Sequence, residues 1–310
     1  MTSPHLSILV VSYNTKKMTL ECLASVFEQT RLTTFELIVW DNASSDGSPE
    51  AIAEAYGSRV RFVKSDENLG FAAANNRAAE IATGDYLLLL NPDTIILDGA
   101  IDALAAFADQ FPQCGIWGGR TLFKDGSLNP SSCWGRQTLW SLFCQATGLS
   151  VLFKHTSVFN PEGMGGWNRE GVRAVDIVSG CFFMITSELW AALGGFREEF
   201  FMYGEEADLC LRAKKLGAAP RVTSDATIVH YGGASERVFA DKLVRLLKAK
   251  ILLINMHLPP VARQIGRYLL FLWPVRRYCL HAVLAAGGRR ASNDARNAWL
   301  DAVRRYREWW

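Results

Sequence analysis

The sequence predicts an α/β fold in which a Rossmann-like, mostly parallel sheet carries helices on both faces and a basic helical tail follows. Apolar runs alternate with segments of helical period along residues 6–230, and this alternation favours parallel strands joined by helices. The most apolar run, residues 85–93 (Asp-Tyr-Leu-Leu-Leu-Leu-Asn-Pro-Asp), is too short for an exposed helix and predicts a strand buried on both faces. Asp93 ends this run, at the edge where such sheets bind ligands.

The other elements follow from the same two periods. Leu6–Tyr13 is a continuous apolar run typical of a buried strand, and Lys16–Thr30 repeats its apolar residues at helical spacing. Ser48 and Pro49 suit the N-cap and first position of a further helix. Strands are expected at 6–13, 35–40, 59–63, 85–93, 176–186 and 222–229, and helices at 16–30, from 48, and at 71–82, 98–111, 189–193 and 205–217.

Residues 114–167 have the least regular pattern, with Trp134, Trp140 and Trp167 among glycines and polar residues. A long irregular segment inside a compact domain is usually a functional loop or lid. Its aromatic rings can stack on a sugar or contact lipid, and they can equally be ordinary packing.

Composition indicates an ordinary globular protein of 310 residues, 49% hydrophobic and with a net charge of +2. Its seven cysteines form no Cys-x-x-Cys pair, which argues against a disulfide framework and a zinc site and favours a reducing cytosol. The N-terminus lacks the basic region of a secretory signal. The C-terminal apolar runs are interrupted by Arg276 and Arg277, so no membrane-spanning helix is expected.

Charge is distributed unevenly along the chain. Residues 236–310 hold fifteen Lys or Arg against five Asp or Glu, whereas residues 1–235 hold eighteen against twenty-six. The sequence therefore predicts a basic tail that differs physically from an acidic body.

Polar side chains follow the first two predicted strands. The first strand-to-helix turn has neither Gly-x-Gly-x-x-Gly nor Gly-Lys-Ser/Thr, which disfavours dinucleotide oxidoreductases, P-loop enzymes and nucleotidyltransferases. Asn14 after the first strand and Asp41 after the second can instead hydrogen-bond a base or ribose. Asp41 can also be a turn or capping aspartate, and Asp93 a turn residue.

Acidic residues and a histidine supply the candidate chemistry. A predicted helix begins with three acids, Glu205, Glu206 and Asp208, directly after four apolar or aromatic residues. Beside an apolar wall the pKa of a carboxyl group is raised, which makes these acids candidates for a general base. Alternatively, the acids only complement the positive end of the helix dipole. His230 follows the last predicted strand and is a candidate third metal ligand or an ordinary histidine.

Taken together, six stretches within residues 6–235 resemble the family 2 glycosyltransferases of GT-A fold, and among them the rhamnosyltransferases. Each stretch is weak evidence alone, but all six stand in the family's order. They are Val11-Ser-Tyr-Asn14, Asp41-Asn-Ala-Ser-Ser-Asp-Gly-Ser48, Asn68-Leu-Gly-Phe-Ala-Ala-Ala-Asn-Asn76, Asn91-Pro-Asp93, Gly204-Glu-Glu-Ala-Asp-Leu209 and His230-Tyr-Gly-Gly.

The resemblance implies a role for each matching residue. Glu206 matches the catalytic base, and Glu205 can exchange roles with it. Asn91-Pro-Asp93 stands where the family has Asp-x-Asp, which leaves Asp93 as the main ligand of Mg²⁺ or Mn²⁺, with His230 reaching the metal or the diphosphate. The implied donor pocket consists of Ser12, Tyr13, Asn14, Asp41, Asn68, Gly70, Asn75 and Asn91.

The implied activity is an inverting transfer of a sugar, L-rhamnose from dTDP-L-rhamnose, to a glycan or polyprenol-linked saccharide in cell-surface polysaccharide synthesis. Another UDP- or dTDP-sugar is the alternative donor, and a non-catalytic sugar-nucleotide-binding protein is the alternative class. Nucleic acid is not an expected partner.

Two domains are expected: a catalytic domain of residues 1–235 and a basic amphipathic helical tail of residues 236–310. Basic residues attract anionic lipid, and the run Tyr268–Trp273 can supply an apolar interfacial face. The expected location is the cytoplasm, at the inner face of the cell membrane. The tail can alternatively pack on the body or on a second subunit in a homo-oligomer.

Overall fold

The computed structural model describes residues 4–232, 239–287 and 291–310, which form two compact units. Of the described residues, unit 1 contains 4–134, 168–201 and 205–232, and unit 2 contains 135–167, 202–204, 239–287 and 291–310. The predicted domain boundary at residue 235 stays a prediction. Residues 233–235, which end the last quoted stretch, and residues 236–238 of the tail lie outside the described residues.

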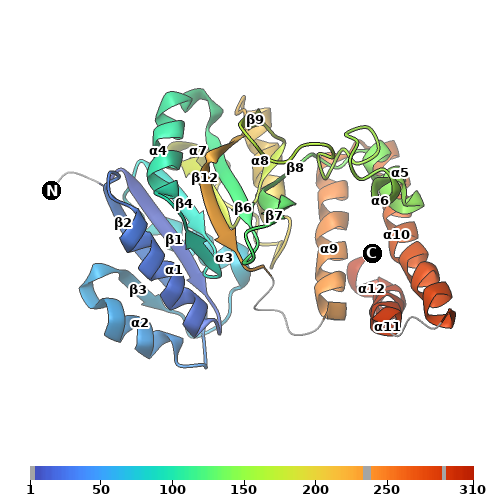
Figure 1. Cartoon of the computed structure of the whole chain (residues 1–310), viewed down its shortest axis with the longest axis horizontal. Coiled ribbons are helices and arrows are strands. Elements are labelled where there is room, and N and C mark those ends of the chain that lie inside the picture. The colour runs from blue at the N-terminus through green and yellow to red at the C-terminus, as the bar shows by residue number, and fades with distance from the viewer. Residues whose placement is uncertain (1–3, 233–238, 288–290) are drawn as a thin grey trace. The chain divides into compact units, whose positions relative to one another are not determined.

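Unit 1 begins with four strands in the order β3-β2-β1-β4, and their pairings are parallel, as predicted. All seven residues of β1 are buried because strands lie on both sides and helices cover both faces. In Figure 1, α1, α2 and α4 lie on one face of the sheet and α3, α7 and α8 on the other. The elements of this half are β1 Leu6–Ser12, α1 Lys16–Gln29, β2 Phe35–Asp41, α2 Ser48–Tyr56, η1 Gly57–Arg59, β3 Arg61–Lys64, α3 Gly70–Glu80, β4 Tyr86–Leu90, β5 Thr94–Ile96 and α4 Ala100–Gln110.

The second half of unit 1 makes the sheet mixed. β11 runs antiparallel to both β4 and β6, and β12 pairs in parallel with β6 and antiparallel with β5. An apolar run buried on both faces looks the same in either direction, so the sequence pattern could not reveal the reversal. The remaining elements of unit 1 are η2 Pro112–Cys114, β6 Ile116–Leu122, β7 Leu128–Asn129, η3 Pro130–Ser132, β8 Cys133–Trp134, β9 Val172–Ala174, β10 Ile177–Val178, β11 Phe182–Thr186, α7 Ser187–Leu193, α8 Glu205–Lys215 and β12 Arg221–His230.

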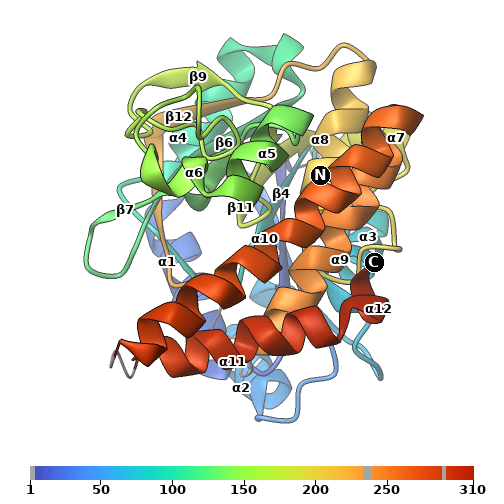
Figure 2. The same cartoon turned by 90° about the vertical axis from the view of Figure 1, so that its right-hand side faces the viewer.

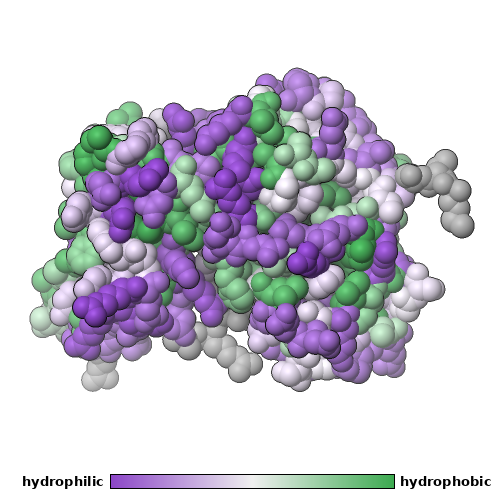
Figure 3. All heavy atoms as spheres, turned by 180° about the vertical axis from the view of Figure 1, so that it is seen from behind, coloured by the Kyte–Doolittle hydropathy of each residue, from purple (hydrophilic) through white to green (hydrophobic). Residues whose placement is uncertain are grey.

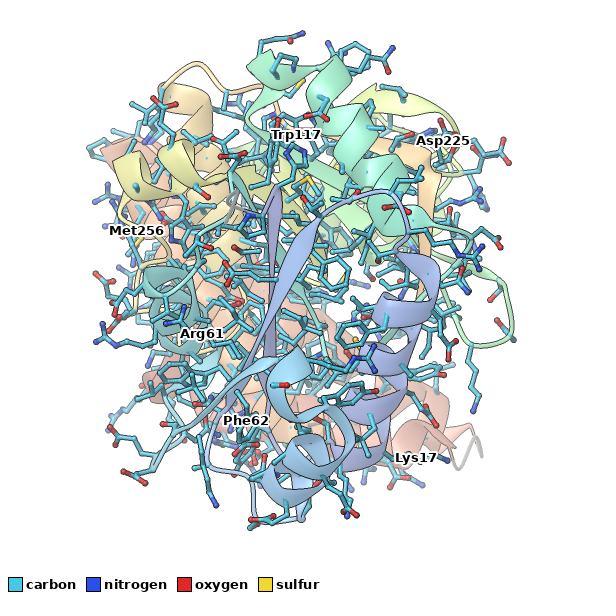
Figure 4. The ribbon with its side chains drawn as sticks, turned by 90° about the vertical axis from the view of Figure 1, so that its left-hand side faces the viewer. Lys17, Arg61, Phe62, Trp117, Asp225 and Met256 are labelled. Atoms are coloured by element: carbon cyan, nitrogen blue, oxygen red, sulfur yellow. The ribbon has the colours of Figure 1, made fainter. Side chains whose placement is uncertain are left out.

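The expectation of an irregular segment at 114–167 was wrong for its first part, because β6 is a core strand. Trp117 on β6 is fully buried beneath α4 and donates its ring N–H to the carbonyl of Phe111 (Figure 4). Gly118 and Gly119 hid the strand, since glycine weakens any strand pattern. They are needed for space, because a Cβ on Gly119 would lie 2.1 Å from the carbonyl oxygen of Ala226. The predicted strand 176–186 is likewise divided into β10 and β11.

Smaller differences from the expected elements are local. Gly47, in the left-handed region, takes the N-cap of α2, so Ser48 is the first helical residue rather than the cap. Arg61 and Phe62 lie on β3, the edge strand, which begins two residues later than predicted (Figure 4). None of the seven cysteines, all within the described residues, forms a disulfide; six are buried and Cys279 is exposed.

Unit 2 is a helical unit with a core of its own. It contains α5 Leu139–Thr147, α6 Leu149–Leu152, α9 Phe239–His257, α10 Pro260–Ala286, α11 Ala291–Arg304 and α12 Tyr306–Trp309. Its core holds Leu247, Ile254, Leu270, Trp299 and Trp309. Figure 2 shows α10 crossing in front of α9, with α11 beside it and α5 and α6 near its upper part. Apolar and hydrophilic side chains alternate over the surface seen in Figure 3.

The expectation that the run Tyr268–Trp273 supplies one apolar interfacial face was wrong. Leu270 is fully buried, and Leu269, Phe271 and Trp273 pack against the core of unit 2. Only Tyr268 and Leu272 of this run are exposed, because a helix turns consecutive residues to different sides. Contrary to the sequence expectation, α10 is long and apolar enough to span a bilayer by length and composition.

We expect Gly119→Ala to lower the free energy of unfolding by about 1–3 kcal/mol, because the added methyl group must displace the β12 backbone or the Phe182 ring, 2.7 Å away. Chemical denaturation measures the change. Gly287→Ala is the control, since the nearest atom to its Cβ is 3.5 Å away. Equal effects of the two substitutions would contradict the close packing of β6 and β12.

Candidate active site

Asp41 lies where β2 ends, directly beside Ser12 at the end of β1. Its side chain is fully buried, and its Oδ2 accepts a hydrogen bond of 2.9 Å from the backbone N–H of Ser44. Oδ1 has no hydrogen-bond partner among the described residues. A buried carboxylate oxygen without a partner is costly, so it favours a ligand donor such as a base N–H or a ribose hydroxyl.

The other predicted residues of the first turn hold its shape. Asn14 has a φ of 52°, and its Oδ1 accepts a 2.8 Å hydrogen bond from the N–H of Ser45. The hydroxyl of Ser12 is within hydrogen-bond distance of Thr19. Tyr13 is exposed, and its ring is available to a bound base. The donor contacts predicted for Ser12, Tyr13 and Asn14 stay predictions.

Asn68, Gly70 and Asn75 build the start of α3. The Oδ1 of Asn68 accepts from the N–H of Gly70 and from the Nδ2 of Asn42. Gly70 has a φ of 80°, and a Cβ there would lie 2.6 Å from Phe201. The Nδ2 of Asn75 donates to the carbonyl of Phe71. These contacts give the three residues a structural role, and their predicted contact with the donor stays a prediction.

Asp93 and His230 lie together where β5 pairs with β12. The Oδ1 of Asp93 is 3.3 Å from the Nε2 of His230, and the Nδ2 of Asn91 is 3.4 Å from the same nitrogen. Burial lowers the pKa of His230, but interactions with Cys181 and then Asp93 outweigh it and raise the pKa to about 11. Without a metal, the raised pKa favours the protonated imidazole, which suits a diphosphate oxygen.

The three residues fit a hard divalent cation. Asn91 Oδ1 is buried without a hydrogen-bond partner among the described residues, and Asp93 is largely buried beside it. The described residues contain no group of three or more His, Cys, Asp or Glu side chains suited to a metal. Mg²⁺ is usually held by one or two carboxylates together with substrate phosphates and water, so Asp93 with Asn91 is a sufficient protein contribution.

The acidic pair opens α8. Glu205 is buried, and its burial, together with the neighbouring Glu206, raises its pKa well above the ordinary range. Glu206 is only half-buried and faces Gly180, where an added Cβ would be 3.8 Å from the Cβ of Glu206 and 3.5 Å from the ring of Phe71. Glu206 is thus the less buried member of the pair, although its Oε2 is enclosed, and it lies beside a glycine that has no side chain.

Asp208, the third acid, is fully buried in an ion pair. Its Oδ2 accepts from the Nε of Arg212 at 2.7 Å, and the other nitrogens of Arg212 donate to the carbonyls of Leu193 and Gly195. Asp208 therefore fixes the first turns of α8 to the segment that precedes it. The spacing of four residues between Asp208 and Arg212 was the available sequence signal.

Asn76 is a residue whose role sequence reasoning missed. Its side chain closes both hydrogen bonds of one backbone unit: Oδ1 accepts from the N–H of Phe196, and Nδ2 donates to its carbonyl, each at 2.9 Å. The N–H of Phe71 also donates to the carbonyl of Phe201. The start of α3 thus holds the segment 196–201, and that segment leads into the acidic pair.

Residues 7–174 match the family model described as glycosyl transferase family 2. The chain is 27% identical over 244 residues to N-acetylglucosaminyl-diphospho-decaprenol L-rhamnosyltransferase of Mycobacterium tuberculosis (strain ATCC 25618 / H37Rv), covering 73% of this chain and 76% of that protein. It is also 27% identical over 246 residues to the O-antigen biosynthesis protein RfbC of Myxococcus xanthus, covering 77% of this chain and 18% of that longer protein.

The fold is shared with a solved enzyme. A mannosyltransferase from Pyrobaculum calidifontis, in complex with GDP-Man and Mn²⁺, matches with a TM-score of 0.58 over 98% of this chain and 86% of that one. At 18% identity the likeness concerns the fold alone. It confirms the predicted fold class, a GT-A-type Rossmann-like sheet with additional C-terminal helices.

We expect Glu205→Gln to stabilise the protein increasingly as pH rises above about 4.5, the ordinary pKa of the side chain. The pKa of Glu205 is raised by folding, so the native state binds more protons than the unfolded state, and the wild type loses stability as pH rises through this window. Glutamine does not titrate and escapes the loss.

Melting temperatures between pH 5 and 8 measure this difference, with the exposed Glu54→Gln on α2 as the control. Parallel profiles for wild type and Glu205→Gln would show that burial of Glu205 does not shift its ionisation.

Proposed function

We propose that this chain, which belongs to glycosyl transferase family 2, transfers a sugar from a nucleoside-diphosphate donor to a saccharide hydroxyl with inversion at the anomeric carbon. The observation that carries the proposal is the placement of Asp41 and Asp93 after strands of one sheet, the first with an orphaned buried oxygen and the second against His230. Ligands of α/β sheets bind at this edge. A nucleoside at Asp41 and a diphosphate near Asp93 use both features.

Glu206 acts as the general base in this proposal. An inverting transfer needs a base on the face of the sugar opposite the leaving group, so that the acceptor hydroxyl loses its proton as it attacks. Burial, together with the neighbouring Glu206, raises the pKa of Glu205 and so favours its protonated form, whereas Glu206 is the less buried of the two and lies beside Gly180. The alternative is that Glu205 is the general base in place of Glu206.

Asn91 and Asp93 would hold Mg²⁺ or Mn²⁺, with His230 either binding the metal or donating to the diphosphate. When bound, the cation stabilises negative charge on the departing diphosphate. The chain itself supplies a cationic His230, which stabilises the same charge, and the Asp93 contact keeps that imidazole protonated and oriented.

The donor sugar in the proposal is L-rhamnose, carried by dTDP. Support comes from the Mycobacterium tuberculosis relative, whose name states an L-rhamnosyltransferase. Another UDP- or dTDP-sugar is the alternative. The same relative's name states a decaprenol-linked acceptor, which supports a lipid-linked saccharide or growing glycan as the acceptor and a place in cell-surface polysaccharide synthesis.

A lipid-linked acceptor favours a cytoplasmic enzyme at the inner face of the membrane. The basic residues of the C-terminal segment suit anionic lipid there. A homo-oligomer formed through the same helices is the alternative use of this segment.

Glu206→Gln should lower turnover by about 10²- to 10⁴-fold, the usual contribution of a general base, because glutamine cannot accept the proton. Donor binding should be retained, since the substitution preserves shape. Single-turnover transfer from dTDP-rhamnose and calorimetric titration of dTDP separate the two effects. The exposed Glu199→Gln is the control; turnover near wild type for Glu206→Gln would move the base to Glu205.

Asp93→Asn should remove metal dependence and weaken donor binding together, because it replaces the charged ligand by an amide. Titration of Mg²⁺ and Mn²⁺ into EDTA-treated protein, followed by donor binding, measures both. Asp98→Asn, at an exposed neighbouring aspartate, is the control. If Asp93→Asn responds to EDTA as the wild type does, Asp93 is not a metal ligand.

A further inference from the structure

The outer side of α10 is apolar over most of its length. We name this surface the outer stripe: Val261, Ile265, Tyr268, Leu272 and Val283, all of which are exposed. Val261 is 77%, Leu272 51% and Val283 71% exposed. The intervals of four, three, four and eleven residues place all five on one side of the helix.

The basic side chains of α10 are engaged inside unit 2 instead. The guanidinium of Arg267 lies 4.6 Å from the ring centre of Trp310, and that of Arg277 lies 5.4 Å from that of Trp299. The Nη2 of Arg276 donates to the carbonyl of Gln145. A helix of a water-soluble protein usually turns its charges outward, whereas α10 also has apolar residues on its outward side and its arginines in contact with unit 2.

The segment α5–α6 packs beside α10 and also exposes apolar side chains. Arg276 connects it to α10 through Gln145, and Leu142 of α5 packs against Gly266, where a Cβ would be 3.2 Å away. Figure 2 shows α5 and α6 next to α10 at the face turned to the viewer. The exposed apolar residues of this segment are Trp140, Phe143, Val151, Leu152 and Phe153.

This combined surface lacks carboxylates altogether. The 27 residues of α10 contain four arginines and a histidine but no Asp or Glu. Residues 139–159 contain Lys154 and His155 and again no Asp or Glu. The ring and carbonyl contacts of the arginines leave their positive charge in place. A second copy of this surface would offer no carboxylate to that charge, whereas an anionic lipid headgroup would attract it. Exposed apolar patches of this kind mark interaction sites.

We propose that the outer stripe of α10 and the apolar side chains of α5–α6 form a docking surface for an anionic lipid bilayer, with α10 lying in the plane of the interface. The inference rests on the proposed function in one respect, the lipid-linked acceptor that docking would serve. Tyr268 and Trp140 are the amphipathic rings that favour the interfacial layer.

An in-plane helix accounts for α10 better than a spanning one. By length and composition α10 could cross a bilayer. However, Arg276 and Arg277 lie just past the middle of the helix, where charges are costly in a hydrocarbon core. In the plane of the interface, the arginines keep their contacts in unit 2 and only the outer stripe enters the lipid.

The test is sedimentation of the full chain with vesicles of phosphatidylglycerol and phosphatidylcholine, compared with vesicles of phosphatidylcholine alone. Wild type should bind the anionic vesicles, and raised salt should weaken binding because the Debye length is only ~8 Å at physiological ionic strength. The double variant Leu272→Glu/Val283→Glu should bind at least roughly tenfold more weakly, because it places carboxylates in the stripe. Leu216→Glu, which is equally exposed on unit 1, should bind as wild type.

Folding of the variants is checked by melting temperature, and a milder variant, Leu272→Ser, covers the case in which the double variant fails to fold. Equal binding by wild type and a folded stripe variant overturns the proposal. The proposal is also overturned, in favour of a second copy, if the wild type does not bind anionic vesicles and ultracentrifugation shows a dimeric wild type but a monomeric stripe variant.

A separate readout isolates the proposed function. Transfer to a water-soluble saccharide acceptor without vesicles depends on unit 1, so it should survive in the stripe variants. Vesicle binding without transfer supports the docking surface and contradicts the proposed function. Transfer without vesicle binding contradicts the docking surface alone.

Discussion

The register of β1 between β2 and β4 is the constraint on which the candidate site depends. Ser12 pairs with Asp41 and Val10 with Leu90, so the three strands end close to the same level. All of β1 is buried, which pins the register, since a slip by one residue would exchange its two faces. In the proposed function, strand spacing rather than loop geometry would thereby separate the nucleoside at Asp41 from the diphosphate near Asp93.

A second set of contacts positions the acids, which lie on a helix outside the parallel strands. Asn76 holds Phe196, and Arg212 connects Asp208 to the carbonyls of Leu193 and Gly195. These polar groups are partly or wholly buried, and removing one partner would leave the others unsatisfied. These contacts hold the segment that precedes Glu206 in place, which suits its proposed role as a base that must meet a hydroxyl at hydrogen-bond distance.

Much of the first half of the fold could be predicted because its strands and helices carry clear periods. β1 and β4 are apolar runs between turn formers, and both were located to within a few residues. β6 was not predicted because Gly118 and Gly119 allow close packing against residues sixty or more positions away, which no local pattern records. The antiparallel direction of β11 could not be predicted either. Burial on both faces removes the alternation of apolar and polar residues that distinguishes strand environments.

The sequence identified the residues of the candidate site better than it identified the contact that each of them makes. The pairing of Asp93 with His230 joins residues 137 positions apart, and it was available only through the resemblance to a family. The neutralising ion pair of Asp208, the double hydrogen bond of Asn76 and the burial that separates Glu205 from Glu206 depend on tertiary packing. For the tail, composition indicated basic helices, but only the three-dimensional arrangement revealed which side of α10 faces outward.

The pattern of cysteine burial has a practical consequence. Burial raises the pKa of Cys22 and of Cys210 to about 12, so their reactive thiolate forms are scarce at neutral pH. Cys279 is the one exposed cysteine of the seven, and it stands seven residues after Leu272 and four before Val283, on the same side of α10. The natural sequence thus carries a nearly selective attachment point for an environment-sensitive fluorophore or a spin label, placed where it reports the polarity next to that helix without any engineered cysteine.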